Sequence, residues 1–254
     1  MTVLVTGHKS GMGRYIFENI GGEVRGWDRD IAEAEKYNIQ QEGVDIVVHC
    51  AFNSAQEITS EELAEYIQDN ILFTEELSNI PHKRFLFFSS VDVYPRDAEL
   101  HKEDVVINVG KVEGLYAITK LMSESIIQKN CPRYVILRNA AFLGMYSRKN
   151  SLRKILEDNA KEVSLAGDSE FNYVVYKDVL SFVKAAIEQD LQGIYNVASA
   201  ENIQLSRVAE LYGKKVVFGG YRYKVGNVDN AKAANIIPAF AKSSQEIIKE
   251  FITL

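Results

Sequence analysis

Tyr116 and Lys120 stand four residues apart in the stretch YAITK, a spacing that places both side chains on one face of a helix. A tyrosine phenol has an ordinary pKa near ~10, so at neutral pH it exchanges protons slowly. A nearby ammonium favours the phenolate and would turn the pair into a general acid and base. The spacing is also common by chance, and the alternative is a packed tyrosine beside a lysine that reaches to solvent.

A serine hydroxyl precedes this pair by the length of one strand-to-helix connection. Ser90 ends the apolar stretch RFLFFSS and lies four residues before Tyr94. Because that stretch has the character of a buried strand, its end could present the hydroxyl to the carbonyl that the tyrosine would serve. The alternative is a strand-end hydroxyl that caps a turn.

The glycine-rich stretch TGHKSGMG, residues 6–13, follows a short apolar run and precedes a helical pattern. Its glycines fit two spacings imperfectly: Gly7, Gly11 and Gly13 in one, and Gly7, Ser10 and Gly13 in the other. A helix N-terminus carries unpaired N–H groups and a partial positive charge, so the stretch suits a pyrophosphate. A merely flexible turn is the alternative.

Asp28, at the end of the stretch GEVRGWD, lies near the interval of ~20 residues at which an acidic side chain accepts hydrogen bonds from an adenosine ribose. With the strand before the glycines and the helix after them, this favours a dinucleotide site. The carboxylate would repel the 2′-phosphate of NADP, whereas Lys9, Arg14 and Arg29 could bind it. Each of these cations could equally be a solvated surface charge. The sequence therefore leaves the choice between NAD and NADP open, and we favour NAD.

Strand and helix patterns alternate along the first half of the chain. The stretch VDIVVHCAF, residues 44–52, is a continuous apolar run typical of a strand covered on both faces, and helical periodicity follows it. Such alternation predicts right-handed crossovers and an α/β fold with a doubly wound parallel sheet, which binds ligands at the carboxyl ends of its strands. Beyond about residue 145 the alternation of strand and helix patterns becomes less regular. Amphipathic helices in SLRKILEDNA, LSRVAELYG and SSQEIIKEFI predict a smaller α/β lobe folded against the sheet.

Composition limits the possible functions. The chain has 254 residues, of which 46% are hydrophobic and 25% charged, and a net charge of −6 argues against a general nucleic-acid binder. It starts with strand-like residues and no secretory leader, and no apolar run reaches the ~18 residues that span a bilayer. Cys50 and Cys131 are too few for a disulfide framework, and the histidines show no metal-ligand spacing with them. We therefore expect a cytoplasmic protein that contacts neither nucleic acid nor membrane and holds no metal.

These motifs resemble the extended short-chain dehydrogenases/reductases, also called the NAD-dependent epimerase/dehydratase family. The resemblance runs nearly end to end through stretches that are weak singly and specific in their common order. They are TGHKSGMG, VDIVVHCAF, NILFT, FLFFSSVDVYP, YAITK, YVILRNAAFLG, VVYKDVLSFVKAAIE with GIYNVAS, and NVDNAKAANIIP. On this resemblance the glycine-rich stretch is the pyrophosphate turn, with its middle glycine displaced by one position, and its GHK start is similar to members that use NADPH.

The resemblance implies roles for individual residues. Tyr116 becomes the general acid/base, Lys120 the ribose ligand that modulates its pKa, and Ser90 the hydrogen-bonding partner of the reacting oxygen. The implied cofactor contacts are Gly7, Lys9, Ser10, Gly11, Met12, Gly13, Asp28, Ala51, Asn70, Tyr116 and Lys120. The implied substrate contacts are Asp92, Asn139 and Arg148.

The chain departs from the family where dehydratases carry their acids. Dehydratases have Asp-Glu directly after the active-site hydroxyl, and this chain has Val91 and Asp92 there. Dehydration is therefore not expected, and Asp92 is either an auxiliary acid or a turn residue.

A second departure concerns the substrate diphosphate. Nucleotide-sugar epimerases usually place an asparagine after the L-R strand and an arginine before a later V-x-D segment, where this chain has Ala141 and Phe171. Either other cations hold the diphosphate or the substrate is not nucleotide-linked. The available cations are Arg148, Lys149 and Arg153, each of which could equally be a solvated surface charge.

We expect residues 1–145 to form a dinucleotide-binding domain, with 171–198 returning to its sheet, and residues 146–170 and 199–254 to form the substrate lobe. The expected activity is NAD(P)-dependent transfer of hydride to or from a carbon of a small-molecule sugar, as a nucleotide-sugar 4-epimerase or a keto-sugar reductase. The alternative is a non-catalytic NAD(P)-binding sensor or regulatory protein on the same fold. The sequence leaves open whether the protein forms a homodimer.

Overall fold

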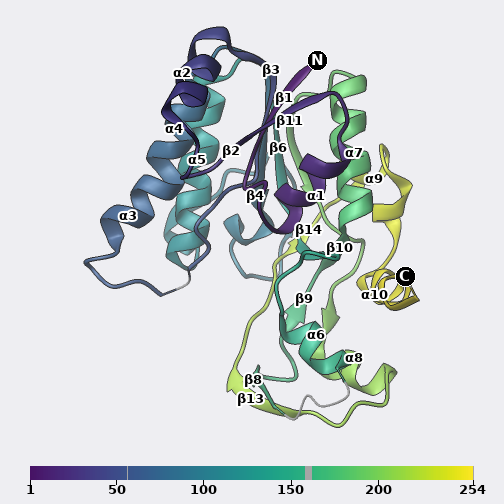
Figure 1. Ribbon diagram of the computed structural model, residues 1–254. Coiled ribbons are helices and arrows are strands. Elements are labelled where there is room, and N and C mark those ends of the chain that lie inside the picture. Colours follow the sequence, from purple (N-terminus) through teal and green to yellow (C-terminus); the bar gives the residue numbers. More distant parts are fainter. Residues whose placement is uncertain (56, 158–161, 254) are drawn as a thin grey trace.

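A parallel β-sheet forms the body of the molecule (Figure 1). The computed structural model describes residues 1–55, 57–157 and 162–253. Its main sheet has the order β11-β6-β4-β3-β1-β2, with every neighbouring pair parallel. The strands are β1 (Thr2–Thr6), β2 (Glu23–Trp27), β3 (Val44–His49), β4 (His82–Ser90), β6 (Tyr134–Asn139) and β11 (Gly193–Val197). The predicted doubly wound sheet is confirmed, and its strand order reverses between β1 and β3, where such sheets bind ligands.

Helices cover both faces of this sheet (Figure 1). One face carries α1 (Gly11–Asn19) and α7 (Tyr176–Glu188), and the other carries α2 (Glu33–Glu42), α4 (Phe73–Ser78) and α5 (Leu115–Asn130). Along β1, Val3 and Val5 pack into the first core and Leu4 into the second, all with no exposed surface. Because successive strand side chains alternate between faces, a strand buried on both sides must be apolar throughout, which explains the continuous apolar runs.

The helical stretch before β4 is not uniform. It consists of α3 (Leu63–Ile67), the π-helical turn η1 (Gln68–Leu72) and α4. A π-turn widens the helix by one residue and often marks a functional position. Here it contains the fully buried Asn70.

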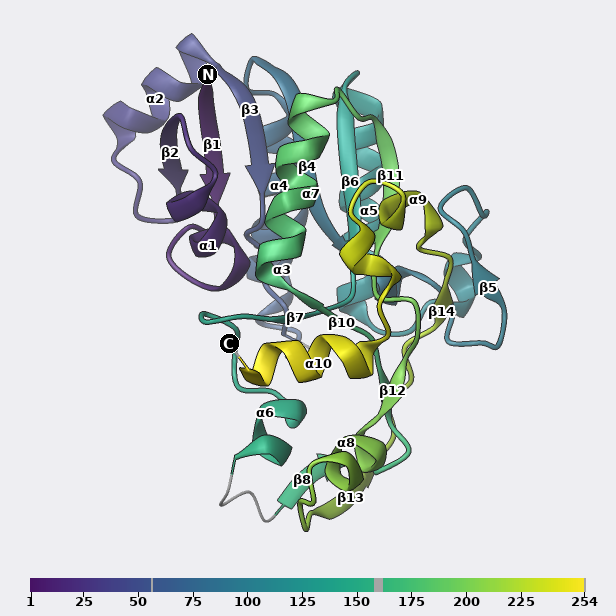
Figure 2. The ribbon, with the colours of Figure 1, turned by 90° about the vertical axis from the view of Figure 1, so that its right-hand side faces the viewer.

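A third core lies beyond the carboxyl ends of the strands, where α6, α8 and α10 are grouped (Figure 2). Its elements are α6 (Ser151–Leu156), β8 (Glu162–Leu165), α8 (Leu205–Leu211), β13 (Val217–Tyr221) and α10 (Ser244–Thr253). Two short strand pairs lie between it and the sheet, β7 (Ala141–Leu143) with β10 (Tyr173–Val175) and β9 (Glu170–Phe171) with β12 (Ile203–Gln204), and a third pair, β8 with β13, lies within it. The small lobe and its three helices are thus present, although residues 158–160 of the first predicted helix lie outside the described residues.

The C-terminal part of the chain crosses back to the sheet before it ends in the small lobe. The returning elements are β14 (Asn227–Val228), which pairs with β5 (Leu100–His101), then α9 (Ala231–Ala234) and η4 (Pro238–Ala241). Ala233 and Phe240 are fully buried in the same core as α1 and α7. The short helices η2 (Val91–Val93) and η3 (Val109–Lys111) follow β4 and precede α5. The division of the chain into cofactor and substrate domains stays a prediction.

None of the described helices combines the length and the apolar character that crossing a membrane requires.

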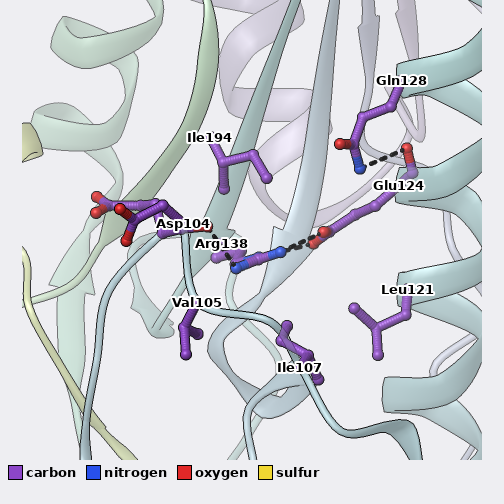
Figure 3. A pocket seen from close by; sticks show the side chains of 9 residues that line it. Asp104, Val105, Ile107, Leu121, Glu124, Gln128, Arg138 and Ile194 are labelled. Atoms are coloured by element: carbon purple, nitrogen blue, oxygen red, sulfur yellow. Dashed lines mark hydrogen bonds and ion pairs between the residues drawn. The ribbon is translucent and has the colours of Figure 1, made fainter.

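A buried ion pair connects α5 to the sheet. Arg138 of β6 places Nη2 2.7 Å from Glu124 Oε2, and the two side chains are 4% and 2% exposed. Ser89 donates to the same carboxylate at 2.5 Å, and Arg138 also donates to the Tyr94 hydroxyl at 2.7 Å. The pair lies in a cavity of about 330 Å³ between residues 103–107, α5, β6 and β11 (Figure 3). Both charges are satisfied by protein groups, so the pair has a structural role.

Removing one member of this pair should strongly destabilise the fold. Arg138→Leu leaves the Glu124 carboxylate buried without its counter-ion, and we expect the free energy of unfolding to fall by about 3–5 kcal/mol. The matched control is Arg207→Leu, because Arg207 pairs with Glu210 on the exposed side of α8. That variant should unfold at nearly the wild-type urea concentration. Equal losses in the two variants would contradict the structural role.

Candidate active site

The glycine-rich turn packs tightly at the switch point between β1 and β3. A Cβ atom on Gly7, which has φ +69°, would lie 2.9 Å from the backbone nitrogen of Ala51. A Cβ atom on Gly13 would lie 2.4 Å from the carbonyl oxygen of Gly7. Gly11 opens α1 at φ +57°, and a Cβ atom there would meet the Tyr176 hydroxyl at an ordinary contact distance of 3.7 Å, so its conformation rather than its packing requires glycine. This close-packed turn at a helix N-terminus fits the pyrophosphate of a dinucleotide.

The remaining predicted contacts of this turn differ in what they can offer a ligand. Ser10 is exposed and its side chain caps no backbone group of α1. Met12 is 5% exposed and packs into the core between α1 and the sheet, so its side chain is not available to a cofactor. The Ala51 N–H donates to the Thr6 hydroxyl at 3.0 Å. Contacts from Met12 and Ala51 would therefore come mainly from the backbone.

Asp28 follows the end of β2 and is held by Lys9. The Lys9 ammonium lies 2.6 Å from Asp28 Oδ2 and 3.1 Å from Asp30 Oδ2. Partial burial acts to raise the pKa of Asp28, but hydrogen bonds from Lys9 and from the Asp30 backbone N–H outweigh it and hold that pKa below its ordinary value. The carboxylate is therefore ionised and partly neutralised at the place predicted for the adenosine ribose.

The structure does not bring the other two predicted phosphate-binding cations to Asp28. Arg29 pairs with Glu65 at 3.0 Å and also with Asp69, both in the helical stretch before β4. Arg14 pairs with Glu18 at 2.8 Å. Of the three cations, Lys9 alone contacts Asp28 in the described structure.

His8 is a residue of this region that the sequence did not single out. Its Nε2 lies 3.6 Å from Asp28 Oδ2, and its ring packs 5.1 Å from the ring of Phe17. A Cβ atom on Gly26 would meet the His8 ring at 2.6 Å, so that glycine makes room for the imidazole. Its Nδ1 is buried and has no hydrogen-bond partner among the described residues. A histidine within a glycine-rich loop gives no spacing signal that would predict this contact.

Lys120 is almost fully buried and points towards the end of β4. Its ammonium donates to the carbonyl oxygen of Phe88 at 2.5 Å and lies 3.5 Å from the centre of the Phe52 ring. The distance to the centre of the Tyr116 ring is 5.8 Å. Burial lowers the pKa of Lys120 to about 7, while Cys50 and Glu124 act in the opposite direction.

Tyr116 lies one helical turn before Lys120 and is half-buried. Burial and the Asp92 carboxylate raise the pKa of the phenol well above its ordinary value, and a hydrogen bond with Ser90 acts the other way. The expected lowering of this pKa by Lys120 does not occur in the described contacts, because the ammonium faces Phe88 and Phe52. The protonated phenol is therefore the favoured form.

Ser90 ends β4 beside Asn139, its register partner on β6. The Ser90 hydroxyl accepts the Asp92 backbone N–H at 3.1 Å, so it caps η2 as well as bonding with Tyr116. Asn139 donates to two strand carbonyls, and its buried Oδ1 has no partner among the described residues. Both descriptions of Ser90 therefore hold: it is a turn cap and a neighbour of the tyrosine.

Asn70 contacts the loop after β3 rather than open space. Its side chain accepts the Asn53 N–H at 2.7 Å and donates to the Asn53 carbonyl at 3.0 Å. Its own carbonyl accepts from Thr74 and from Ser123 of α5. A direct side-chain contact with a cofactor is not supported, because the amide oxygen and the amide nitrogen of Asn70 both bond to that loop.

Arg148, one of the predicted substrate contacts, is hydrogen-bonded within the protein. It donates to the Ser54 hydroxyl at 2.9 Å, which links the segment after β7 with the loop after β3. The other two predicted cations are engaged elsewhere: Arg153 with the Gly144 carbonyl and Lys149 with Glu157. Of these three cations, Arg148 is the one that contacts the loop after β3 in the part of the chain that the structure describes.

Two residues that the sequence did not predict contact Asp92. The Tyr223 hydroxyl, from the segment between β13 and β14, donates to Asp92 Oδ1 at 2.7 Å. The Arg96 guanidinium lies 3.8 Å from the same carboxylate oxygen and 4.6 Å from the centre of the Tyr223 ring. The Phe171 ring also packs on Tyr223, with the ring centres 4.6 Å apart. These residues lie in irregular or very short segments, where periodicity carries no information.

The glycine turn, Ser90 and the YAITK helix lie within residues 3–198, which match the model of the NAD dependent epimerase/dehydratase family. The chain belongs to this family.

Several solved structures share the fold across nearly the whole chain. A dTDP-4-dehydrorhamnose reductase from Clostridium acetobutylicum is 18% identical with a TM-score of 0.79, covering 100% of this chain and 99% of that one. The same enzyme from Bacillus anthracis, in complex with NADP, is 15% identical with a TM-score of 0.81, covering 99% and 98%. UDP-glucuronic acid 4-epimerase from Bacillus cereus, in complex with UDP-glucuronic acid and NAD, is 19% identical with a TM-score of 0.73, covering 99% and 98%. A comparison with curated protein sequences finds no match.

The low pKa of Lys120 predicts a pH-dependent stability. Because the folded pKa is about 7 and the ordinary value is 10.5, the unfolded chain binds more protons between these values, and stability rises with pH there. Between pH 7 and pH 9 the wild type should gain about 1–2 kcal/mol relative to Lys120→Met. Lys129→Met, on the exposed side of the same helix, is the control and should change in parallel with the wild type. Urea unfolding at both pH values measures this, and a parallel course for Lys120→Met would contradict it.

Proposed function

We propose that this chain is an NAD(P)-dependent oxidoreductase that moves hydride to or from a carbon of a nucleotide-linked sugar. The observation that carries the proposal is the convergence of Ser90 and Tyr116 at the carboxyl end of β4, with Lys120 one turn along α5. The family and the nucleotide-sugar enzymes among the structural neighbours support the substrate class.

Each residue has a distinct task in this proposal. Tyr116 gives its proton to the carbonyl oxygen when the sugar is reduced and removes the hydroxyl proton when it is oxidised. Ser90 hydrogen-bonds the same oxygen, and Lys120 holds the nicotinamide ribose. Gly7 and Gly13 shape the turn for the pyrophosphate. A bound nicotinamide supplies or accepts the hydride.

The protonated phenol favours the reducing direction. Because burial and Asp92 keep Tyr116 protonated, it is ready to donate to a carbonyl oxygen. We therefore place keto-sugar reduction first and 4-epimerisation second. Dehydration is not proposed, since Val91 replaces the first acid of the dehydratases and is itself buried in the core.

Tyr116→Phe should remove catalysis without removing cofactor binding. The variant lacks the proton donor but keeps the aromatic ring, so we expect kcat to fall by at least ~100-fold, in line with the usual contribution of general acid catalysis. Turnover of a 4-keto nucleotide sugar with NADPH or NADH is measured, with Tyr221→Phe as the matched control on the exposed end of β13. Unchanged turnover in Tyr116→Phe would exclude this mechanism.

The purified protein separates the finer alternatives. NAD that stays bound through purification would favour the epimerase, and consumption of NADPH or NADH with a keto-sugar would favour the reductase. Cofactor binding without turnover on any sugar of the panel would favour the non-catalytic sensor.

The contact of Lys9 with Asp28 predicts use of both cofactors with a lean towards NAD(H). The carboxylate would disfavour a 2′-phosphate by about 1–4 kcal/mol at contact distance, and the Lys9 ammonium offsets part of this. We expect Lys9→Ala to increase the preference for NADH and Asp28→Ala to reverse it, as measured by dissociation constants. Arg29→Ala should leave the ratio unchanged, because Arg29 is paired with α3 and η1.

One result would overturn this assignment. A preference for NADPH of tenfold or more in the wild type, about 1.4 kcal/mol, that is lost in Lys9→Ala would make Lys9 the ligand of the 2′-phosphate.

A further inference from the structure

A continuous chain of contacts leads from the segment beside the small lobe to the catalytic hydroxyls. The Tyr223 hydroxyl donates to Asp92 Oδ1 at 2.7 Å. The other carboxylate oxygen lies 3.4 Å from the Ser90 hydroxyl, which in turn hydrogen-bonds Tyr116. Tyr223 thus touches neither catalytic hydroxyl directly but holds the carboxylate that faces both.

Tyr223 is itself held firmly. Its ring packs between Phe171 of β9 and the guanidinium of Arg96, each at 4.6 Å. Its backbone N–H donates to Ser169 at 3.1 Å, and its carbonyl accepts the Glu170 N–H at 2.8 Å. The hydroxyl is therefore presented to Asp92 by β9 and the segment leading into it, which connect the sheet to the small lobe.

Building on the proposed function, we propose that Tyr223 is a positioning residue that holds the Asp92 carboxylate away from Ser90 and Tyr116. The 3.4 Å separation between Asp92 and Ser90 is long for a hydrogen bond, so the carboxylate holds the serine hydroxyl only weakly and a substrate oxygen can compete for it. Without Tyr223 the carboxylate loses its strong donor and can turn both oxygens to the catalytic hydroxyls. The serine would then be occupied by Asp92 instead of the substrate.

The charged groups around Asp92 determine in which direction each substitution changes the pKa of Tyr116. Arg96 is the cation facing Asp92 from its own segment, and Arg96 also pairs with the exposed Glu113 at 3.2 Å. The group facing Asp92 from α5 is the Tyr116 phenol, which Tyr66 of α3 also influences. The Asp92 charge raises the pKa of Tyr116, so losing the Tyr223 donor should raise it further, and removing the charge should lower it.

The test is a double-substitution cycle with Tyr223→Phe and Asp92→Asn. We expect Tyr223→Phe to lower kcat roughly tenfold with little change in KM. The alkaline limb of its pH–rate profile should move to higher pH. Asp92→Asn should move the alkaline limb to lower pH. Tyr223→Phe should have almost no further effect in the Asp92→Asn background, because its partner carboxylate is gone. Tyr221→Phe, exposed on the neighbouring strand, is the matched control and should behave as wild type.

Urea unfolding of the same four proteins separates this proposal from the proposed function. Absence of turnover in the wild type rejects the proposed function, while a coupling between the two substitutions in unfolding would still support the contact. Additive effects on kcat, or an unfolding change in Tyr223→Phe with an unchanged kcat and pH profile, would overturn the positioning role.

Discussion

The arrangement of the site depends on two buried charges that α5 carries against the sheet. Lys120 and Glu124 lie one turn apart on the same face, and burying either charge without a partner would cost several kcal/mol. The carbonyl of Phe88 accepts from Lys120, and Arg138 of β6 pairs with Glu124. These partners fix the register of α5 against β4. Because Tyr116 lies one turn before Lys120, the same register places its phenol at the end of β4. The buried ion pair and the position of the Tyr116 phenol are therefore consequences of one packing.

The cofactor turn and this helix are linked through the loop after β3. The backbone of Ala51 lies directly against Gly7, and the Ala51 N–H donates to the Thr6 hydroxyl just before the glycine turn. Asn70 fixes the next part of the loop through the backbone of Asn53, and its carbonyl accepts from Ser123 of α5. The π-turn at η1 allows Asn70 to direct its side chain to the loop and its carbonyl to the helix. The three parts of the site thus share one hydrogen-bonded framework.

Local periodicity in the sequence was enough to predict the sheet and the helix that carries Tyr116 and Lys120 one turn apart. Continuous apolar runs indicated a parallel sheet because each strand is buried on both faces, and YAITK indicated a common face because four residues make about one helical turn. The glycine spacing stayed ambiguous until the structure showed that packing requires glycine at 7 and 13, and backbone conformation requires it at 11. The partners of long side chains were not predictable: nothing near Arg29 in the sequence indicates its pairing with Glu65. The same holds for Tyr223, whose irregular segment has no period.

The small lobe explains why this site differs from the expected family pattern. Where nucleotide-sugar epimerases usually carry an arginine, Phe171 packs against Tyr223 and cannot pair with a phosphate. The aromatic contact instead presents a hydroxyl to Asp92 and brings Arg96 over the Tyr223 ring. Arg148, a predicted diphosphate cation, donates to the Ser54 hydroxyl in the loop after β3. The phenylalanine at this position therefore packs on the aromatic ring of Tyr223, whose hydroxyl contacts Asp92.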